Sequence, residues 1–223
     1  MREQKNRLNS IFKRMLMMIA WITFSMLFIV CIPSSSIATI AKKATLQSLV
    51  EQAQLIVHIK VEDMWSPKHR GSQGEIYTYS RLRLIEVWNG TLESPEIILV
   101  QLGGSIDDLK LKVHGDAELK VGDEVILFLS SSPKDQLPVP TAKAIGTHQV
   151  VHLISLAQGA FFVDRTTSQP DPYVRQKLDD LVFYTEQNTH LNLKYKAVEQ
   201  DPTPVWTLSS LRTMINGLSG AKP

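Results

Sequence analysis

Cysteine is almost absent from this chain, since Cys31 is the only one among 223 residues. It lies in an apolar stretch near the N-terminus, and no cysteine remains if that stretch is removed as a secretory leader. The mature fold then has no disulfide framework and no thiol nucleophile. With about 180 residues after the leader, the chain is long enough to rely on a hydrophobic core instead.

Motifs of the common enzyme classes are also missing. The sequence has no Gly-x-Ser-x-Gly elbow, no glycine-rich phosphate loop between a strand and a helix, and no EF-hand spacing. His148 and His152 would lie on one face of a strand and could bind a metal with a third ligand from His58 or His114. Clustered carboxylates that could hold calcium are Asp107, Asp108, Asp116, Asp123 and Glu124. Exposed strand histidines and solvated turn acids explain both sets without a metal, so we expect no cofactor and favour a non-enzymatic protein.

Charge is absent from Met15 to Ile32, while residues 1–14 carry five basic residues and one acid. Small residues follow, and either Ser36-Ile37-Ala38 or Thr39-Ile40-Ala41 fits a cleavage site. This pattern predicts a secretory signal over residues 1–41. Because the apolar run approaches the length of a bilayer span, an uncleaved inner-membrane anchor over residues 15–32 is the alternative, and a lipoprotein acylated at Cys31 is a third.

Export follows from each of these arrangements, because the basic residues keep the N-terminus cytoplasmic and place the domain in the periplasm or outside the cell. The membrane is then contacted only through the N-terminal segment. We expect a domain beginning at Lys42 to fold without that segment.

Net charge gives no sign of nucleic-acid binding. The whole chain has 24 basic and 22 acidic residues, and without residues 1–41 it has 19 basic and 21 acidic ones. A nearly balanced mature domain lacks the basic patch that nucleic-acid binding needs, so no nucleic-acid partner is expected.

Alternating apolar residues predict a β-rich domain organised around Ile76 to Gly90. In this stretch the alternation slips at Leu84-Ile85, which predicts a β-bulge, and Asn89-Gly90 predicts a tight turn. Further strands are predicted at residues 55–62, 97–102, 125–129, 149–156 and 160–163. The predicted fold is mainly β, a small antiparallel OB-like barrel of five or more strands over residues 42–165.

Helices are predicted at both ends of this barrel. Thr45 would cap a short helix before the first strand, and Thr207 would begin the last helix. Another helix is predicted after Asp171 and Pro172, with an apolar stripe of Val174, Leu178, Leu181 and Val182. Residues 166–223 would thus form a helical extension packed on the barrel.

Several short motifs resemble a group of exported, largely uncharacterised bacterial proteins. They include Ile76-Tyr-Thr-Tyr79, Glu86-Val-Trp-Asn-Gly90, Gln101-Leu-Gly-Gly104, Val121-Gly-Asp-Glu124 and Ala157-Gln-Gly-Ala-Phe161. More distantly, the order of helix, hairpin and strands resembles the OB-type barrel of netrin-like and metalloproteinase-inhibitor domains. That resemblance implies a barrel. The zinc-chelating N-terminal cysteine and the disulfides of that family have no counterpart here.

One strand face combines aromatic and basic residues, namely Tyr77, Tyr79, Arg81 and Arg83. This composition is typical of protein-binding hot spots, so the face is a candidate interaction surface. The alternative is a barrel face covered by the C-terminal helices. Our functional hypothesis is an exported binding or scaffolding protein of the bacterial envelope, with an envelope or secreted protein as partner. The alternatives are a protease-inhibitor-like domain and a metal-dependent enzyme.

Overall fold

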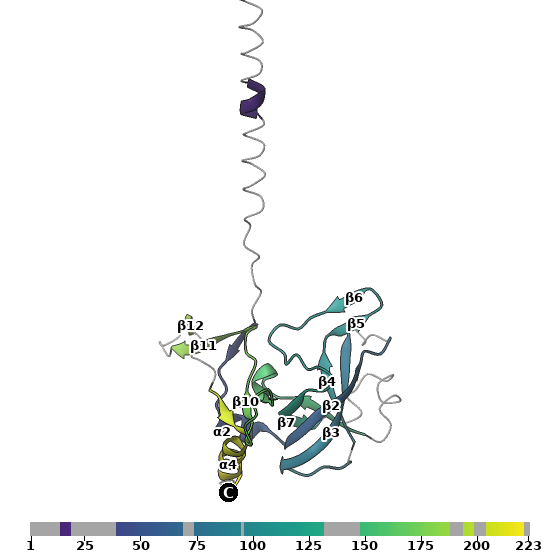
Figure 1. The fold of residues 1–223 in the computed structure, drawn as a ribbon, viewed down its shortest axis with the longest axis vertical. Helices are drawn as coiled ribbons and strands as arrows, with labels where there is room; N and C mark the ends of the chain where they lie inside the picture. The colour runs from purple at the N-terminus through teal and green to yellow at the C-terminus, as the bar shows by residue number, and fades with distance from the viewer. Residues whose placement is uncertain are drawn as a thin grey trace, which may run out of the picture. The chain divides into compact units, whose positions relative to one another are not determined.

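A computed structural model describes residues 14–18, 39–68, 74–94, 96–131, 148–187, 194–198 and 204–220 (Figure 1). The chain divides into two compact units, Met1–Ile37 and Ala38–Pro223. In the first unit residues 14–18 are helical, whereas Cys31 and most of the predicted anchor lie outside the described residues. No helix in the described parts of the chain is long and apolar enough to span a bilayer.

The centre of the second unit is a closed barrel of five strands. They are β2 (Leu55–Trp65), β3 (Tyr77–Asn89), β4 (Ile97–Leu102), β7 (Glu124–Ser131) and β8 (Gln149–Leu153). The pairs run β2–β3–β4–β8–β7, and β7 pairs with β2 to close the ring. The predicted small barrel is confirmed.

Four of the five pairings in this ring are antiparallel, as predicted, and the β4–β8 pair is parallel. The parallel pair follows from the number of strands. Strand directions can alternate all the way round a ring only if the number of strands is even, so a ring of five must contain a parallel pair. The barrel is therefore mixed.

Bulges bend the long β2–β3 hairpin. Ile85 is an extra residue of β3, because His58 lies opposite Glu86 and Ile59 lies opposite Leu84. This confirms the bulge that the slipped alternation predicts. Trp88 of β3 and Glu62 of β2 are extra residues in the same way. An extra residue increases bend and twist, which long strands need in order to wrap round a narrow barrel.

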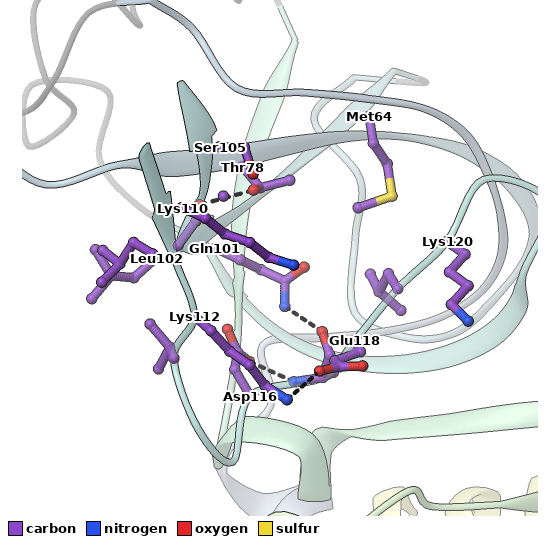
Figure 2. A pocket seen from close by; sticks show the side chains of 16 residues that line it. Met64, Thr78, Gln101, Leu102, Ser105, Lys110, Lys112, Asp116, Glu118 and Lys120 are labelled. Atoms are coloured by element: carbon purple, nitrogen blue, oxygen red, sulfur yellow. Dashed lines mark hydrogen bonds and ion pairs between the residues drawn. The ribbon is translucent and has the colours of Figure 1, made fainter. Parts of the chain in front are cut away.

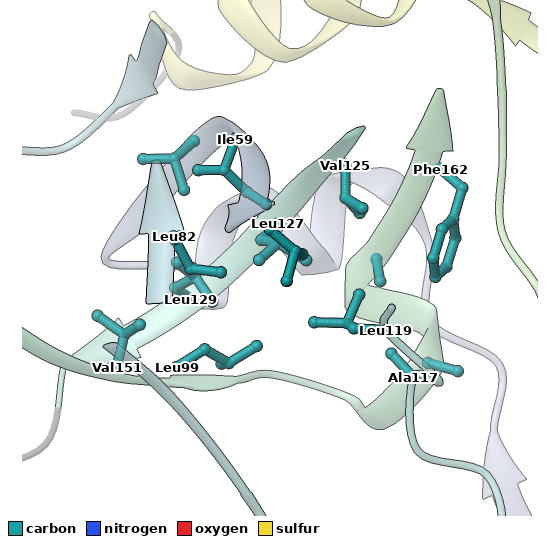
Figure 3. Packing of buried hydrophobic residues seen from close by; sticks show 14 of the residues in the cluster. Ile59, Leu82, Leu99, Ala117, Leu119, Val125, Leu127, Leu129, Val151 and Phe162 are labelled. Carbon is teal, nitrogen blue, oxygen red and sulfur yellow. The ribbon is translucent and has the colours of Figure 1, made fainter. Parts of the chain in front are cut away.

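Aliphatic side chains from all five strands fill the barrel. Leu82, Leu99, Leu127 and Val151 are at most 2% exposed, and Figure 3 shows them directed into one interior from four strands. Burying a leucine or valine contributes roughly 1.5–3 kcal/mol per side chain. The apolar residues that alternate along the predicted strands therefore form the barrel core.

Further strands extend the sheet beyond β7. After the short 3-10 helix η2 (Leu156–Gly159), β9 (Ala160–Asp164) pairs with β7, then β10 (Tyr173–Arg175) with β9 and β13 (Trp206–Thr207) with β10. A separate sheet has the order β1 (Thr39–Lys42), β11 (Leu181–Gln187), β12 (Lys194–Val198). A hairpin of β5 (Gly104–Ile106) and β6 (Leu109–Leu111) follows β4.

Two helices, α2 (Leu46–Gln52) and α4 (Leu208–Ser219), pack together and against the outer side of the sheet (Figure 1). The predicted N-cap at Thr45 and the predicted start of the last helix at Thr207 are confirmed. The Thr45 hydroxyl accepts a hydrogen bond from the Ser48 amide at 3.1 Å, and Thr207 forms a capping box with Ser210. Beneath the helices, the Phe161 ring lies 5.5 Å from that of Phe128 and 5.6 Å from that of Trp206, centroid to centroid.

The prediction of a helix after Asp171 is wrong. Residues 173–175 form β10, and Leu181 begins β11. Val174 pairs with Val163 on one side and Trp206 on the other, so two remote strands supply hydrogen bonds that outweigh the local helical pattern. Asp171 does cap a helix, but a different one: its carboxylate accepts from the Ser209 amide at 3.1 Å in the first turn of α4. The Ser209 hydroxyl also donates to this carboxylate and lowers the pKa of Asp171.

Inside the barrel, Ser80 is fully buried and its hydroxyl has no hydrogen-bond partner within the described part of the chain. We expect Ser80→Ala to raise the free energy of unfolding by roughly 1 kcal/mol, because an unsatisfied buried hydroxyl carries a desolvation cost. Thr78→Ala is the matched control. It removes a 2.8 Å hydrogen bond to the Gly103 carbonyl and should lower the free energy of unfolding by roughly 1 kcal/mol. Urea unfolding measures both, and destabilisation by Ser80→Ala would contradict this account of the core.

Candidate functional site

The best candidate for a functional site is a pocket at one end of the barrel. It forms where β4 ends at Leu102 and the chain turns out into the β5–β6 hairpin. Gly103 and Gly104 make this turn with φ of 108° and 133°, a region that side chains rarely adopt. After the hairpin, residues 112–120 return to β7 and form the far wall.

The pocket has a volume of about 430 Å³. Met64 of β2 and Lys120 lie on one side of it, and Leu102, Lys110 and Lys112 lie on the other (Figure 2). Its remaining lining residues are Thr78, Gln101, Gly103, Gly104, Ser105, Leu111, Val113, Asp116, Ala117, Glu118 and Leu119. Apolar walls with a few polar groups are typical of ligand pockets of this size.

Exposed leucines continue the apolar wall onto the surface. Leu102 is 44% exposed, Leu111 39%, and Leu109 at the hairpin tip 50%. Leu102 ends β4, and Leu109 and Leu111 belong to the hairpin that follows. Exposed aliphatic side chains gathered in this way are typical of surfaces that bind apolar groups.

The three lysines of the pocket differ in their surroundings. Lys112 Nζ lies 2.7 Å from Glu118 and 2.9 Å from Asp180, and these carboxylates raise the pKa of Lys112 and hold it charged. Among the residues that the structure describes, neither Lys110 nor Lys120 has an ion-pair partner. Two ammonium groups are therefore available to an anion at this pocket.

Asp116 is the acid set deepest in the wall. Its carboxylate accepts from the Ala117 amide at 2.8 Å, and the Gln101 side chain supports the same segment by donating to the Ala117 carbonyl at 3.0 Å. Burial raises the pKa of Asp116, which outweighs the opposite effect of its hydrogen bonds. The negative charge at this position is therefore costly to the folded state.

We expect Asp116→Asn to raise the free energy of unfolding at pH 7. A raised pKa means that the folded state binds this proton more tightly than the unfolded state, so the wild type loses stability as pH rises through the folded pKa. The gain in the variant should shrink as pH falls below that pKa. Urea unfolding at pH 7 and pH 4 measures this.

Asp164→Asn is the control of opposite sign, because hydrogen bonds from Thr166 lower the pKa of Asp164. That substitution should lower stability at pH 7. Equal effects of the two substitutions at pH 7 would contradict the environment assigned to Asp116.

The sequence-predicted interaction surface lies elsewhere, on the outer face of β3. This face carries, as predicted, Tyr77, Tyr79, Arg81 and Arg83. Tyr79 is only 1% exposed and stacks on Trp65 at 5.8 Å, and Arg81 lies 5.7 Å above the same indole ring. Tyr77 is half-buried, and this burial raises its pKa, with Glu75 adding to the effect.

Arg83 forms a 3.3 Å ion pair with Glu62, and both side chains are about half exposed. Helix α4 does not cover this face. It packs with Trp88 and Phe161 in a separate cluster, and Arg212 of α4 contacts Glu86 near the end of β3. A role of Arg81 and Arg83 in partner binding stays a prediction.

The potential metal ligands do not converge. Within the described residues, no group of three or more His, Cys, Asp and Glu side chains could hold a metal ion. His148 pairs with Glu96 at 2.8 Å, His152 lies 3.2 Å from the Val100 carbonyl, and His58 lies 2.8 Å from Glu124.

The acidic residues that the sequence analysis considered as calcium ligands likewise do not come together. Glu124 is held by Arg165, whose guanidinium lowers the pKa of Glu124, with His58 contributing less. Asp123 accepts from the Lys120 amide at 2.9 Å and stabilises the turn before β7.

Sequence reasoning missed Lys110, Lys120 and Gln101 as a group. They come from β6, from the segment before β7 and from β4, so no short motif joins them. The only signal was the pair of glycine turns, Gly103-Gly104 and Gly122, that frame the segment.

Comparisons with known proteins identify no family. No protein-family model matches the chain, and a search of curated proteins finds no match. The fold is a small five-strand β-barrel domain, and its function has to be inferred from the pocket itself.

Proposed function

We propose that the protein is an exported, non-enzymatic binding module whose barrel-end pocket takes an anionic group joined to a short apolar chain. The observation that carries this proposal is the position of Lys110 and Lys120 beside an apolar wall, without a carboxylate partner among the described residues. The ammonium groups would hold the anion, and Met64, Leu102 and Leu119 would contact the apolar chain.

The acids at the pocket have partners within the protein. Glu118 is paired with Lys112, and the Asp116 carboxylate accepts a hydrogen bond from the Ala117 amide at 2.8 Å. Gln101, Thr78 and Ser105 add neutral polar groups to the lining. These residue types suit recognition and include no paired nucleophile and base.

A C-terminal carboxylate on an apolar residue has the same chemistry as the proposed ligand, because it too joins an anion to an apolar group. A segment of an envelope or secreted protein is therefore a fitting partner if the N-terminal signal exports this chain. The strand order supports an OB-like barrel: when the five barrel strands are numbered in chain order, they follow one another round the ring as 1-2-3-5-4.

No specific observation among the described residues supports protease inhibition or metal-dependent catalysis.

Three probes with the same six-carbon chain test the proposal: 1-hexanesulfonate, 1-hexanol and hexylammonium. They are titrated into ¹⁵N-labelled protein, and amide shifts are followed along residues 101–120. We expect hexanesulfonate to bind at least about tenfold more tightly than hexylammonium, since one charge-assisted contact contributes roughly 1.5–3 kcal/mol. Equal affinities, or shifts confined to other parts of the barrel, would refute an anion-binding pocket.

A further inference from the structure

The sequence leaves two positions for cleavage of the N-terminal signal, three residues apart. Ser36-Ile37-Ala38 would place the cut before Thr39, and Thr39-Ile40-Ala41 would place it before Lys42. Both triplets have the small residues that a leader-processing peptidase prefers. The residues before Thr39 lie outside the described part of the chain, so the two positions are distinguished by what lies after each of them.

Residues 39–42 belong to the folded domain as strand β1. Thr39, Ile40, Ala41 and Lys42 pair in parallel with residues 181–184 of β11. The Thr39 amide donates to the Asp180 carbonyl at 3.2 Å, and the Thr39 hydroxyl donates to the His114 carbonyl at 2.5 Å. Ala41 packs against the barrel core cluster.

Thr39 is also closely packed. A Cβ added to Gly115 would lie 3.0 Å from the Thr39 Cβ and 2.6 Å from Leu181, so the backbone at Gly115 approaches both residues directly. A cut after Ala41 would remove three of the four residues of β1, together with the two hydrogen bonds of Thr39 and the core contact of Ala41. It would also expose the β11 edge that β1 covers.

We infer that the processing peptidase cleaves the Ala38–Thr39 bond, so that Thr39 is the first residue of the mature protein and β1 remains complete. This inference rests on the export assumed in the proposed function. Hydrolysis adds one water across the amide bond: the carboxylate leaves with Ala38 on the leader, and the amine stays on Thr39 as an ammonium group.

The new ammonium group fits its surroundings. The Thr39 nitrogen already lies within hydrogen-bond distance of the Asp180 carbonyl oxygen. Gly115 and Leu181, which contact Thr39, line a small cavity of about 140 Å³ whose other lining residues include Asp116, Glu118, Asp179 and Asp180. Four acids against two lysines, Lys112 and Lys177, favour a positive charge at this place.

Mass spectrometry of the full-length gene product, expressed in an exporting bacterium and recovered from its envelope, tests the inference. We expect a mature N-terminus at Thr39. A start at Lys42 would overturn the inference while leaving export intact. An intact Met1 would also overturn it, and the cellular fraction that contains the intact chain would then decide whether the proposed export fails too.

Two single substitutions, one at the last residue of each candidate triplet, distinguish the two positions. Ala38→Leu should reduce the fraction of chains that are processed at least tenfold, whereas the matched Ala41→Leu should leave the fraction of chains beginning at Thr39 unchanged within twofold. The reverse pattern, with Ala41→Leu blocking processing, would show that the later position is used.

Discussion

Phe161→Ala is expected to lower the free energy of unfolding by about 3–5 kcal/mol, which is the range for truncating a fully buried phenylalanine. Phe161 is 1% exposed and lies between the rings of Phe128 in the barrel and Trp206 before α4. Its ring therefore connects the barrel to the C-terminal segment, and the cavity left by alanine would loosen both.

Chemical denaturation followed by tryptophan fluorescence measures this loss. Val205→Ala is the control, because Val205 neighbours Trp206 in the chain but is 59% exposed, and it should change the free energy of unfolding by less than about 0.5 kcal/mol. A loss below about 1 kcal/mol for Phe161→Ala would mean that the C-terminal segment is not anchored through this ring.

The double substitution Lys110→Glu with Lys120→Glu is expected to weaken hexanesulfonate binding at least about a hundredfold. Each lysine changes from an attractive to a repulsive charge, and a hundredfold loss corresponds to about 2.7 kcal/mol shared between two positions. Both side chains are exposed at the pocket rim, so the free energy of unfolding should change little.

Hexylammonium should bind the double variant more tightly than the wild type, since the pocket would then carry two additional acids. Lys60→Glu is the matched control. It makes the same kind of charge change at an exposed position of β2 that does not line the pocket. A similar loss of hexanesulfonate binding in Lys60→Glu would attribute the effect to net charge and would contradict a role for the pocket.

Local signals in the sequence predicted much of the fold. Thr45 could be identified as a cap because a cap depends on a hydroxyl and an amide only three residues apart. The slip at Leu84-Ile85 predicted a bulge because alternation along a strand depends on the strand alone.

Features that depend on remote partners were not predictable in this way. The stripe that begins at Val174 suits a helix, yet pairing with Val163 and Trp206 makes that segment a strand, and Asp171 caps α4 instead. The predicted face with Tyr79 exists, but stacking on Trp65 buries that tyrosine. Lys110 and Lys120 belong to one pocket only because the hairpin and the segment after it fold back on the barrel end.

The most direct test of the anion-binding pocket is a crystal structure of the protein grown with 1-hexanesulfonate. We predict the sulfonate oxygens within about 3 Å of the amines of Lys110 and Lys120, with the hexyl chain against Met64 and Leu119. A sulfonate bound only at another basic surface, or a pocket that stays without ligand at saturating concentration, would contradict the proposed function.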